Sequence, residues 1–489
     1  MCSPCGHTAL GLIAIMKQLP ADFIQLVESL PIPSPQGLIE ALSATSPSVS
    51  VRRNPAPKGD GVVAAFPSHT PVAWSRGLGM YLPERPDFTL DPLFHAGAYY
   101  VQDASSMAIA HVIAQITRPD LPVAYADACA APGGKTTAAL SVLPEGSLVV
   151  ANEYVPSRAA ILRENLMKWG DERVVVTVGD TANFARLGQV FDIIAADVPC
   201  SGEGMMRKDD EAVSQWSTAL VEQCARRQWE IVCNLWQALK PGGHLIYSTC
   251  TFNTSENEQM VGRIISELGA EPISVEWPAG SGIVVSPHGA RFMPHLLSGE
   301  GLFISVLRKS DDGSSSGSPL PKLHKAATRT SGPSRQPRPS GDMARIISTV
   351  ASWVRPDVMA GMDIIERDAT VRLFPKSWSH LLAAIEKSMR VSYAGVDAAE
   401  IKGRDIIPSH PLAMWRGTAS ETFPTIDLPL REALGYLHKD TFDSTYLDGL
   451  PKGYVMVTYR HLPLGWIKNI GNRANNLYPK EWRILKPIH

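Results

Sequence analysis

Short runs of apolar and β-branched residues alternate with longer amphipathic runs between positions 123 and 248. The short runs predict strands, and the longer runs predict helices because their apolar residues recur at helical spacing. The expected strands are Val123–Ala128, Ser147–Asn152, Arg173–Val178, Phe191–Ala196 and His244–Ser248, with helices at Lys135–Val142, Pro156–Trp169 and Ser217–Leu239 and edge strands, which could include an antiparallel one, at Ile273–Val275 and Leu302–Leu307. Since helices separate the central strands, the order predicts an α/β fold with a Rossmann-like parallel sheet covered on both faces.

A different pattern precedes this sheet, across residues 19–97. Helical periodicity at Ala21–Leu30 and Pro35–Ala44 is followed by short strand-like runs at Ser50–Arg53 and Gly61–Ala65. A passage rich in Pro and Gly then leads to the sheet. The segment is expected to form a small α+β module that packs against the sheet domain.

A stretch rich in Ser, Gly and Pro interrupts the chain from Ser310 to Gly341. Such a composition cannot bury enough apolar surface to offset the entropy cost of ordering the chain, so we predict a flexible linker. The expected divisions are an N-terminal extension and module (1–97), a catalytic domain (98–309), the linker (310–341), an intermediate subdomain (342–393) and a C-terminal α+β domain (394–489).

Composition indicates a soluble globular protein. Of 489 residues, 44% are hydrophobic and 19% are charged, and no apolar run reaches the roughly 18 residues that span a bilayer. The apolar run from Thr8 to Met16 lacks the flanks of a signal peptide. Seven cysteines, an odd number at irregular spacing, favour a reducing, cytoplasmic location. Cys2, Cys5 and His7 fall short of the four ligands of a zinc site, so no metal is expected.

Charge is distributed unevenly along the chain. The overall net charge is −2, but seven Lys or Arg stand against one Glu between Lys452 and His489. Aromatic residues are interleaved with these cations: Tyr454, Tyr459, Trp466, Tyr478 and Trp482. Cations hold phosphates and aromatic rings stack on unpaired bases, so the mixture is compatible with RNA binding. A solvated basic face beside an ordinary aromatic core explains the same pattern equally well.

The segment from Asp127 to Thr136 is the strongest cofactor signal. It follows a buried-looking strand and opens a helix, which is where open α/β sheets bind ligands. A Walker A loop would need glycine where Cys129 stands, and the Gly133-Gly134 pair does not have the spacing of a dinucleotide fingerprint. The loop therefore predicts a ligand without a pyrophosphate.

Two acidic residues at strand ends refine this prediction. Glu153 ends the second strand, where a carboxylate can accept hydrogen bonds from two ribose hydroxyls. Asp180 ends the third strand, where it could reach the exocyclic amine of an adenine. Each acid alone could simply cap a turn, but the ordered set favours S-adenosylmethionine.

Two cysteines follow the next pair of strands. Cys200 lies in the segment Asp197–Gly204, Cys250 lies in Ser248–Thr251, and both should face the cofactor crevice. A thiolate that adds to carbon 6 of cytosine would activate carbon 5 for methylation, and an acid must stabilise the charge that builds at N3. Asp197 is placed for that task, and burial would help it keep its proton. Cys224 and Cys233 are expected to be packing residues.

The segments Ala128–Thr136, Asp197–Gly204 and Leu239–Cys250 resemble the signature motifs of the Nop/Sun family of RNA (cytosine-5) methyltransferases. Tyr99–Met107 resembles the family's lead-in to the sheet, and Arg53–Pro55 resembles its RNA-facing module. By position, the resemblance implies that Cys250 is the nucleophile, that Cys200 assists product release and that Asp197 contacts the base, and Arg207 falls where the family carries a basic residue. The implied cofactor residues are Cys129, Ala130, Ala131, Pro132, Gly133, Gly134, Lys135, Glu153, Asp180 and Asp197.

The C-terminal part is similar to the bacterial subgroup of this family that acts on small-subunit ribosomal RNA and ends in a PUA-like RNA-binding module. The implied activity is methylation of carbon 5 of a cytosine, with S-adenosylmethionine as cofactor and 16S ribosomal RNA or the small subunit as partner. Nothing in the sequence demands more than a monomer, and a cytoplasmic location follows from the cysteine pattern. A tRNA methyltransferase and a non-catalytic ribosome-assembly factor stay open as alternatives. A binding-only protein would need neither Cys200 nor Cys250, which argues against the second. A nucleotide-dependent enzyme built on Gly134-Lys135-Thr136 is disfavoured by the missing glycine.

Overall fold

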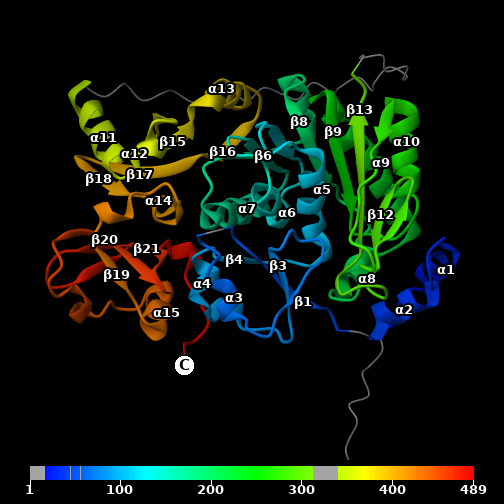
Figure 1. Cartoon of the computed structure of the whole chain (residues 1–489), viewed down its shortest axis with the longest axis horizontal. Helices are drawn as coiled ribbons and strands as arrows, with labels where there is room; N and C mark the ends of the chain where they lie inside the picture. Colours follow the sequence, from blue (N-terminus) through cyan, green and yellow to red (C-terminus); the bar gives the residue numbers. More distant parts are fainter. Residues whose placement is uncertain (1–16, 45, 56, 312–339, 489) are drawn as a thin grey trace, which may run out of the picture.

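The computed structural model describes residues 17–44, 46–55, 57–311 and 340–488 (Figure 1). Cys2, Cys5, His7, the apolar run from Thr8 and nearly all of the predicted linker lie outside the described residues. Among the helices of the described part, none combines the length and the apolar character that a membrane crossing requires.

Five parallel strands form the centre of the largest sheet and confirm the predicted α/β fold. In spatial order they are β7 (Val174–Val178), β6 (Leu148–Glu153), β5 (Ala124–Asp127), β8 (Phe191–Asp197) and β9 (Leu239–Thr249). The strand order reverses next to β5, and this topological switch point is where such sheets bind ligands.

Alternate residues of each central strand face opposite sides of the sheet, as the two-residue period requires. In β6, Val149 and Ala151 pack with one core cluster, whereas Leu148 and Val150 pack with another. The first cluster is covered by α5 (Ala108–Ile116), α6 (Gly134–Leu140) and α7 (Pro156–Trp169). The second is covered by α9 (Thr218–Trp236), α10 (Glu258–Leu268) and α13 (Ser379–Ser388).

Antiparallel strands extend both edges of this sheet. The predicted run Leu302–Leu307 lies within β13 (Leu302–Lys309), which pairs with β9. Beyond β13 lie β12 (Gly289–Phe292) and β11 (Val284–Ser286), and β10 (Ala270–Pro272) also pairs with β13. The predicted strand Ile273–Val275 is wrong, because β10 ends at Pro272. The Ile273 amide still donates to the Val306 carbonyl at 2.9 Å, and Ile273 and Val275 pack with Trp277 against the core.

The other edge is completed by a segment from beyond the linker. Strand β16 (Arg390–Ala394) pairs antiparallel with β7, although more than 200 positions separate the two strands along the chain. The catalytic sheet therefore depends on residues on both sides of the predicted linker. The exact domain limits stay predictions.

The N-terminal module contains α1 (Ala21–Ser29), α2 (Pro35–Ala44) and a four-stranded sheet. The order of that sheet is β2 (Thr70–Pro71), β3 (Gly79–Leu82), β1 (Val49–Arg53) and β4 (Tyr99–Val101). The run Gly61–Ala65, expected as a strand, instead contains the short helix α3 (Val62–Ala65). The helical turn buries Val62 completely and leaves Val63 exposed, so packing overrides the strand preference of two valines.

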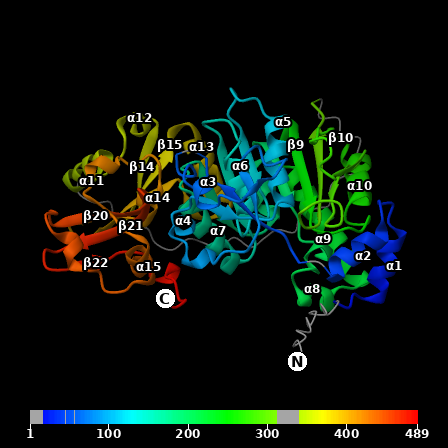
Figure 2. The same ribbon diagram turned by 60° about the horizontal axis from the view of Figure 1, so that its bottom comes forward.

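Two four-stranded sheets follow the linker. The first consists of β14 (Met362–Arg367), β15 (Thr370–Pro375), β17 (Val396–Lys402) and β18 (Asp405–Pro408), and the second of β19 (Thr425–Asp427), β20 (Gly453–Tyr459), β21 (Leu462–Asn469) and β22 (Ala474–Asn476). The second sheet and the N-terminal module share one hydrophobic core, in which Val51 and Tyr99 join Val455 and Leu464. Both views show the last sheet beside α3 and α4 (Pro92–His95) of this module, whereas α1 and α2 lie at the opposite end of the molecule (Figures 1 and 2).

The aromatic residues near the C-terminus serve mainly as core. Trp466 and Tyr478 are only 1% and 2% exposed, and Tyr459 is also buried. The cations between them are mostly exposed: Lys452, Arg460, Arg473, Lys480, Arg483 and Lys486. Stacking of RNA bases on the buried rings is therefore excluded, and only the cations offer a surface to phosphates.

Candidate active site

The carboxyl ends of the five parallel strands line up the predicted site residues in a row. Following the sheet from β7 to β9, the row reads Asp180, Glu153, Cys129, Asp197 and Cys250. The spatial order differs from the chain order because the sheet reverses direction next to β5. This single edge thus carries the predicted cofactor residues at one end and the predicted nucleophile at the other.

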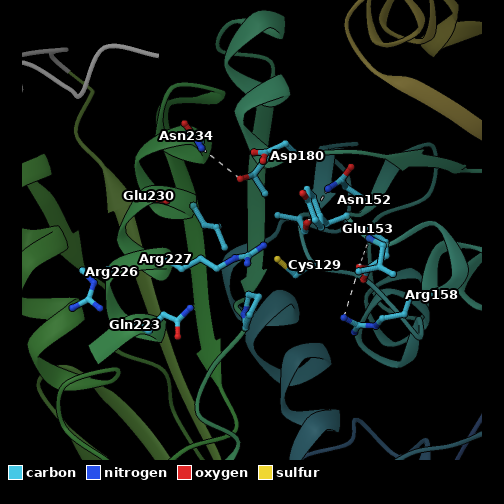
Figure 3. Close-up of a pocket in the computed structure, with 16 residues that line it drawn as sticks. Cys129, Asn152, Glu153, Arg158, Asp180, Gln223, Arg226, Arg227, Glu230 and Asn234 are labelled. Carbon is cyan, nitrogen blue, oxygen red and sulfur yellow. Dashed lines mark hydrogen bonds and ion pairs between the residues drawn. The ribbon is translucent and has the colours of Figure 1, made fainter. Parts of the chain in front are cut away.

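A cavity of about 680 Å³ opens beside the cofactor end of this row. That volume lies within the range of small-molecule pockets. Cys129, Glu153 and Asp180 line one wall, and residues of α9, including Gln223 and Arg227, line the other (Figure 3). Ala130–Lys135 and Asp197, also predicted for the cofactor, are not among the lining residues.

Glu153 has the environment expected of a buried hydrogen-bond acceptor. Its side chain is 4% exposed, and Oε1 accepts a hydrogen bond from the Val155 amide at 2.9 Å. Arg158 Nη1 lies 3.7 Å from the same oxygen, which balances the buried charge. A carboxylate accepts about four hydrogen bonds, so capacity remains for two ribose hydroxyls. Glu153 therefore fits a ligand with a ribose, such as the S-adenosylmethionine expected from the sequence.

Sequence reasoning missed two residues that shape this wall. Asn152, within β6, donates from Nδ2 to the carbonyl oxygens of Ala128 and Gly179 at 3.1 and 3.0 Å, and so ties β6 to the loops after β5 and β7. Arg158 Nη2 donates to the Ala131 carbonyl at 3.0 Å. Arg158 lies in the first turn of α7, five positions after the strand-end acid, and this spacing could have identified it.

The loop after β5 is shaped by backbone geometry and by the N-terminal module. Gly133 has a φ of 106°, a conformation that favours glycine. Arg52 of this module is fully buried. It donates from Nη2 to Thr137 Oγ1 at 2.6 Å and from Nε to Gln102 Oε1 at 2.8 Å. These contacts hold α6 against the N-terminal module. Burial lowers the pKa of Arg52 to about 9. No short-range sequence pattern indicated this contact.

Asp197 forms an ion pair instead of standing alone as an acid. Lys135 Nζ lies 2.8 Å from Asp197 Oδ2, and Ser248 Oγ donates to Oδ1 at 2.7 Å. Burial alone would lower the pKa of Lys135, but the charge and hydrogen bond of Asp197 outweigh it and raise that pKa. The expectation of a dry pocket around Asp197 is wrong, because its side chain is 32% exposed and forms an ion pair with Lys135.

The two predicted cysteines meet at the far end of the row. Cys200 Sγ and Cys250 Sγ are 3.3 Å apart, although 50 positions separate the residues, and both are partly exposed. The hydrogen bond from Cys250, then burial, raises the pKa of Cys200 well above that of an ordinary thiol. The contact and the raised pKa of Cys200 are compatible with a proton held on the Cys200 sulfur.

A buried polar network joins the two cysteine loops. Glu203 Oε2 accepts hydrogen bonds from the amides of Phe252 and Asn253 at 2.6 and 2.9 Å, across the gap between the loops. Ser201 Oγ and Thr251 Oγ1 are 2.9 Å apart, and the Gly204 amide donates to the Cys250 carbonyl at 2.8 Å. This network holds the sulfurs in contact, and the sequence analysis did not identify it.

The remaining predicted residues lie away from the reacting groups or are already engaged. Arg207 is buried against Glu300, with Nη2 and Oε1 2.6 Å apart, so it serves this internal ion pair. Cys233 is 3% exposed and packs in the core as expected. Cys224, also expected in the core, is only half-buried on α9.

Three family models match the chain. Residues 118–308 match the 16S rRNA methyltransferase RsmB/F model, residues 19–104 match the N-terminal domain of 16S rRNA methyltransferase RsmF, and residues 423–484 match the methyltransferase RsmF PUA domain. Together they cover the N-terminal module, most of the large sheet and the last sheet.

Full-length relatives agree with these models. The chain is 31% identical over 424 residues to ribosomal RNA small subunit methyltransferase F of Cronobacter sakazakii, and 30% identical over 424 residues to that of Erwinia tasmaniensis. Each match covers 84% of both chains. The crystal structure of NSun6 from Pyrococcus horikoshii with SFG shares the fold, with a TM-score of 0.51 at 19% identity over 59% of this chain and 98% of that chain.

S-adenosylmethionine is the methyl donor of this enzyme class, which confirms the cofactor predicted from the sequence. The chain belongs to the ribosomal RNA small subunit methyltransferase F family.

Proposed function

We propose that this protein methylates carbon 5 of a cytosine in 16S ribosomal RNA through a covalent bond between Cys250 and carbon 6. The observation that carries the proposal is the pair of sulfurs, 3.3 Å apart, on the same sheet edge as the cofactor cavity. Methyl transfer to oxygen or nitrogen would need no thiol, because those atoms are nucleophilic without help. Carbon 5 of cytosine requires activation, and a thiolate supplies it.

The reaction begins at Cys250. Its thiolate adds to carbon 6, and the electron pair of the C5–C6 double bond moves toward carbon 5 and N3. The ammonium of Lys135 lies close enough for its charge to interact with the Cys250 sulfur, which favours the thiolate. Bound S-adenosylmethionine supplies the methyl group that carbon 5 then takes up.

Lys135 and Asp197 are assigned to the N3 edge of the ring. As negative charge builds at N3, the proton that the two residues share neutralises it. After methylation, water takes the carbon 5 proton, the C5–C6 double bond re-forms, and the C6–S bond breaks to return the Cys250 thiolate. The proton on N3 returns to the Lys135–Asp197 pair, so that the product is neutral 5-methylcytosine. Cys200, in contact with that sulfur, assists this last step.

The substrate is inferred from the relatives, which are named as ribosomal RNA small subunit methyltransferases. Bisulfite sequencing of total RNA from cells with and without the gene tests the proposal. We expect one cytosine of 16S ribosomal RNA to lose its protection from deamination when the gene is deleted. Loss of protection in tRNA alone would support the tRNA alternative, and unchanged protection everywhere would contradict cytosine-5 methylation.

The exposed C-terminal cations are expected to hold RNA phosphates. Replacing Lys452, Arg473 and Lys480 together with Glu should weaken RNA binding and reduce the slope of log K against log salt by about 0.7 for each phosphate that is no longer neutralised. A salt titration by fluorescence anisotropy measures this slope. Substitution tests the cations alone, whereas truncation after Ser310 would also remove β16 from the large sheet.

A matched control replaces three exposed cations on other elements: Arg118, Arg263 and Arg367. This control should leave the salt slope near that of the unmodified protein. Equal slopes in all three proteins would remove the C-terminal cations from the binding surface.

A further inference from the structure

The two sulfurs lie between charges of opposite sign. Lys135 is on the Cys250 side, where its charge and that of the Cys250 thiolate interact. Glu256 accepts a hydrogen bond at 3.0 Å from the amide of Ser201, the residue after Cys200, and its negative charge adds to the hydrogen bond with Cys250 and to burial in raising the pKa of Cys200. A proton shared by the two sulfurs is therefore drawn toward Cys200, and the negative charge is drawn toward Cys250.

Glu256 is held firmly in this position. It is fully buried, and its oxygens accept hydrogen bonds from the Ser201 amide at 3.0 Å, Gln228 Nε2 at 2.6 Å and Asn253 Nδ2 at 2.8 Å. Among the described residues, it forms no ion pair with a lysine or arginine. A buried carboxylate without a counter-ion projects its charge strongly, because little solvent screens it.

Other titratable groups interact with the sulfurs or with the neighbours of the sulfurs. Tyr247 interacts with Cys200, and Cys224 interacts with Cys250. Glu203 interacts with Glu256, Arg227 with Cys224 and Asp197 with Lys135. Glu203 adds negative charge beside Glu256 and raises the pKa of that carboxyl together with burial. Asp197 is neutralised by Lys135 at 2.8 Å. Arg227 is the one cation among these five. The pKa of Cys200 is raised by the hydrogen bond with Cys250, by burial and then by the negative charges of Cys250 and Glu256.

We propose that Cys200 assists release as an S–H donor to the Cys250 sulfur that leaves carbon 6, and that Glu256 is the positioning residue that keeps the proton on Cys200. This inference rests on the proposed function and specifies what Cys200 does in it. The alternative, in which Cys200 acts as the base that removes the carbon 5 proton, would require Cys200 to ionise beside the negative charge of Glu256.

The release step balances without a proton from Cys200. Water takes the carbon 5 proton, the C5–H electron pair forms the C5–C6 double bond, and the electrons of the C6–S bond go to the Cys250 sulfur. The S–H group of Cys200 stabilises that developing thiolate by a charge-assisted hydrogen bond. The 3.3 Å contact between the sulfurs is the geometry that such a donor needs.

Two substitutions at position 200 separate a donor from a base. Alanine neither donates nor accepts a proton, whereas serine donates a hydrogen bond but does not ionise at neutral pH. With S-adenosylmethionine and ribosomal RNA present, Cys200→Ala should accumulate a protein–RNA adduct on a denaturing gel. Cys200→Ser should turn over, with an adduct fraction about 10-fold lower, since a hydrogen bond to a charged group contributes 1.5–3 kcal/mol.

An adduct as abundant in Cys200→Ser as in Cys200→Ala would overturn the donor role while leaving covalent catalysis in place. The absence of an adduct in both variants would instead overturn the covalent route of the proposed function, and the donor role would fall with it. The gel therefore distinguishes the two failures.

The role of Glu256 has its own measurement, which needs no RNA. Alkylation of Cys200 by iodoacetamide, followed by peptide mass spectrometry across a pH series, reports the ionisation of that thiol. Glu256→Gln should lower the pH of half-maximal Cys200 alkylation by about one unit or more, because a negative charge is removed. Glu222→Gln, an exposed carboxylate on α9, is the matched control and should not shift it. An unshifted profile in a Glu256→Gln protein that still binds S-adenosylmethionine would remove Glu256 from the proposal.

Discussion

Cys250→Ala is expected to abolish methylation while RNA and cofactor binding persist. Removal of a nucleophile from a covalent mechanism costs several orders of magnitude, so we expect a loss of more than about 10³-fold in kcat. The small side chain leaves the cofactor cavity unchanged, since Cys250 is not among its lining residues. Transfer of radiolabelled methyl groups to 16S ribosomal RNA measures the loss, and gel shift and calorimetry measure the two binding steps.

Cys224→Ala is the control for the chemistry of the thiol. Cys224 is another partly exposed cysteine, and it lies on α9, outside the pair of sulfurs that touch each other. Its substitution should leave methylation near the normal rate. If the Cys250→Ala protein methylated RNA at a rate comparable with this control, Cys250 would not be the nucleophile.

The central sheet could be predicted from the sequence because its information is local. Strand β7 is Val-Val-Val-Thr-Val, and all but its last residue are buried, so composition alone marks it as a strand between two helical layers. Packing between distant segments was harder to predict. The pairing of β16 with β7 links residues on both sides of the linker, and nothing in Arg390–Ala394 indicates which sheet it joins.

The residues of the site that lie at strand ends could be predicted from the topology of the sheet. Parallel strands place their carboxyl ends on one edge, so Glu153, Asp180, Asp197 and the two cysteines could be expected together. The side chains that position these residues and affect their charge lie outside the strand ends. Glu256 lies in a turn after Cys250, and Arg52 reaches the cofactor loop from the N-terminal module. Side chains of this kind act through three-dimensional contacts, and their spacing along the chain follows no motif.

A single substitution in the ion pair of Lys135 and Asp197 should greatly slow methyl transfer. Asp197→Asn keeps the shape of the side chain but removes the charge that holds the Lys135 proton. General acid catalysis typically contributes about 10²–10⁴-fold, so a loss of that size is expected in the rate of methyl transfer. Single-turnover methylation with saturating RNA measures this step without interference from product release.

Lys135→Met should cause a loss of similar size, because the ammonium is the proton source at N3 and also favours the Cys250 thiolate. The variant that carries both substitutions tests whether the two residues act together. If the two residues act as one unit across their 2.8 Å contact, the double variant should be little slower than either single variant. Losses that multiplied in the double variant would mean that Lys135 and Asp197 act independently, and the assignment of a shared proton to the N3 edge would be wrong.

Ser248→Ala is the control. It removes the hydroxyl that donates to the other Asp197 oxygen but leaves the ion pair intact, so the rate of methyl transfer should fall by about 10-fold at most.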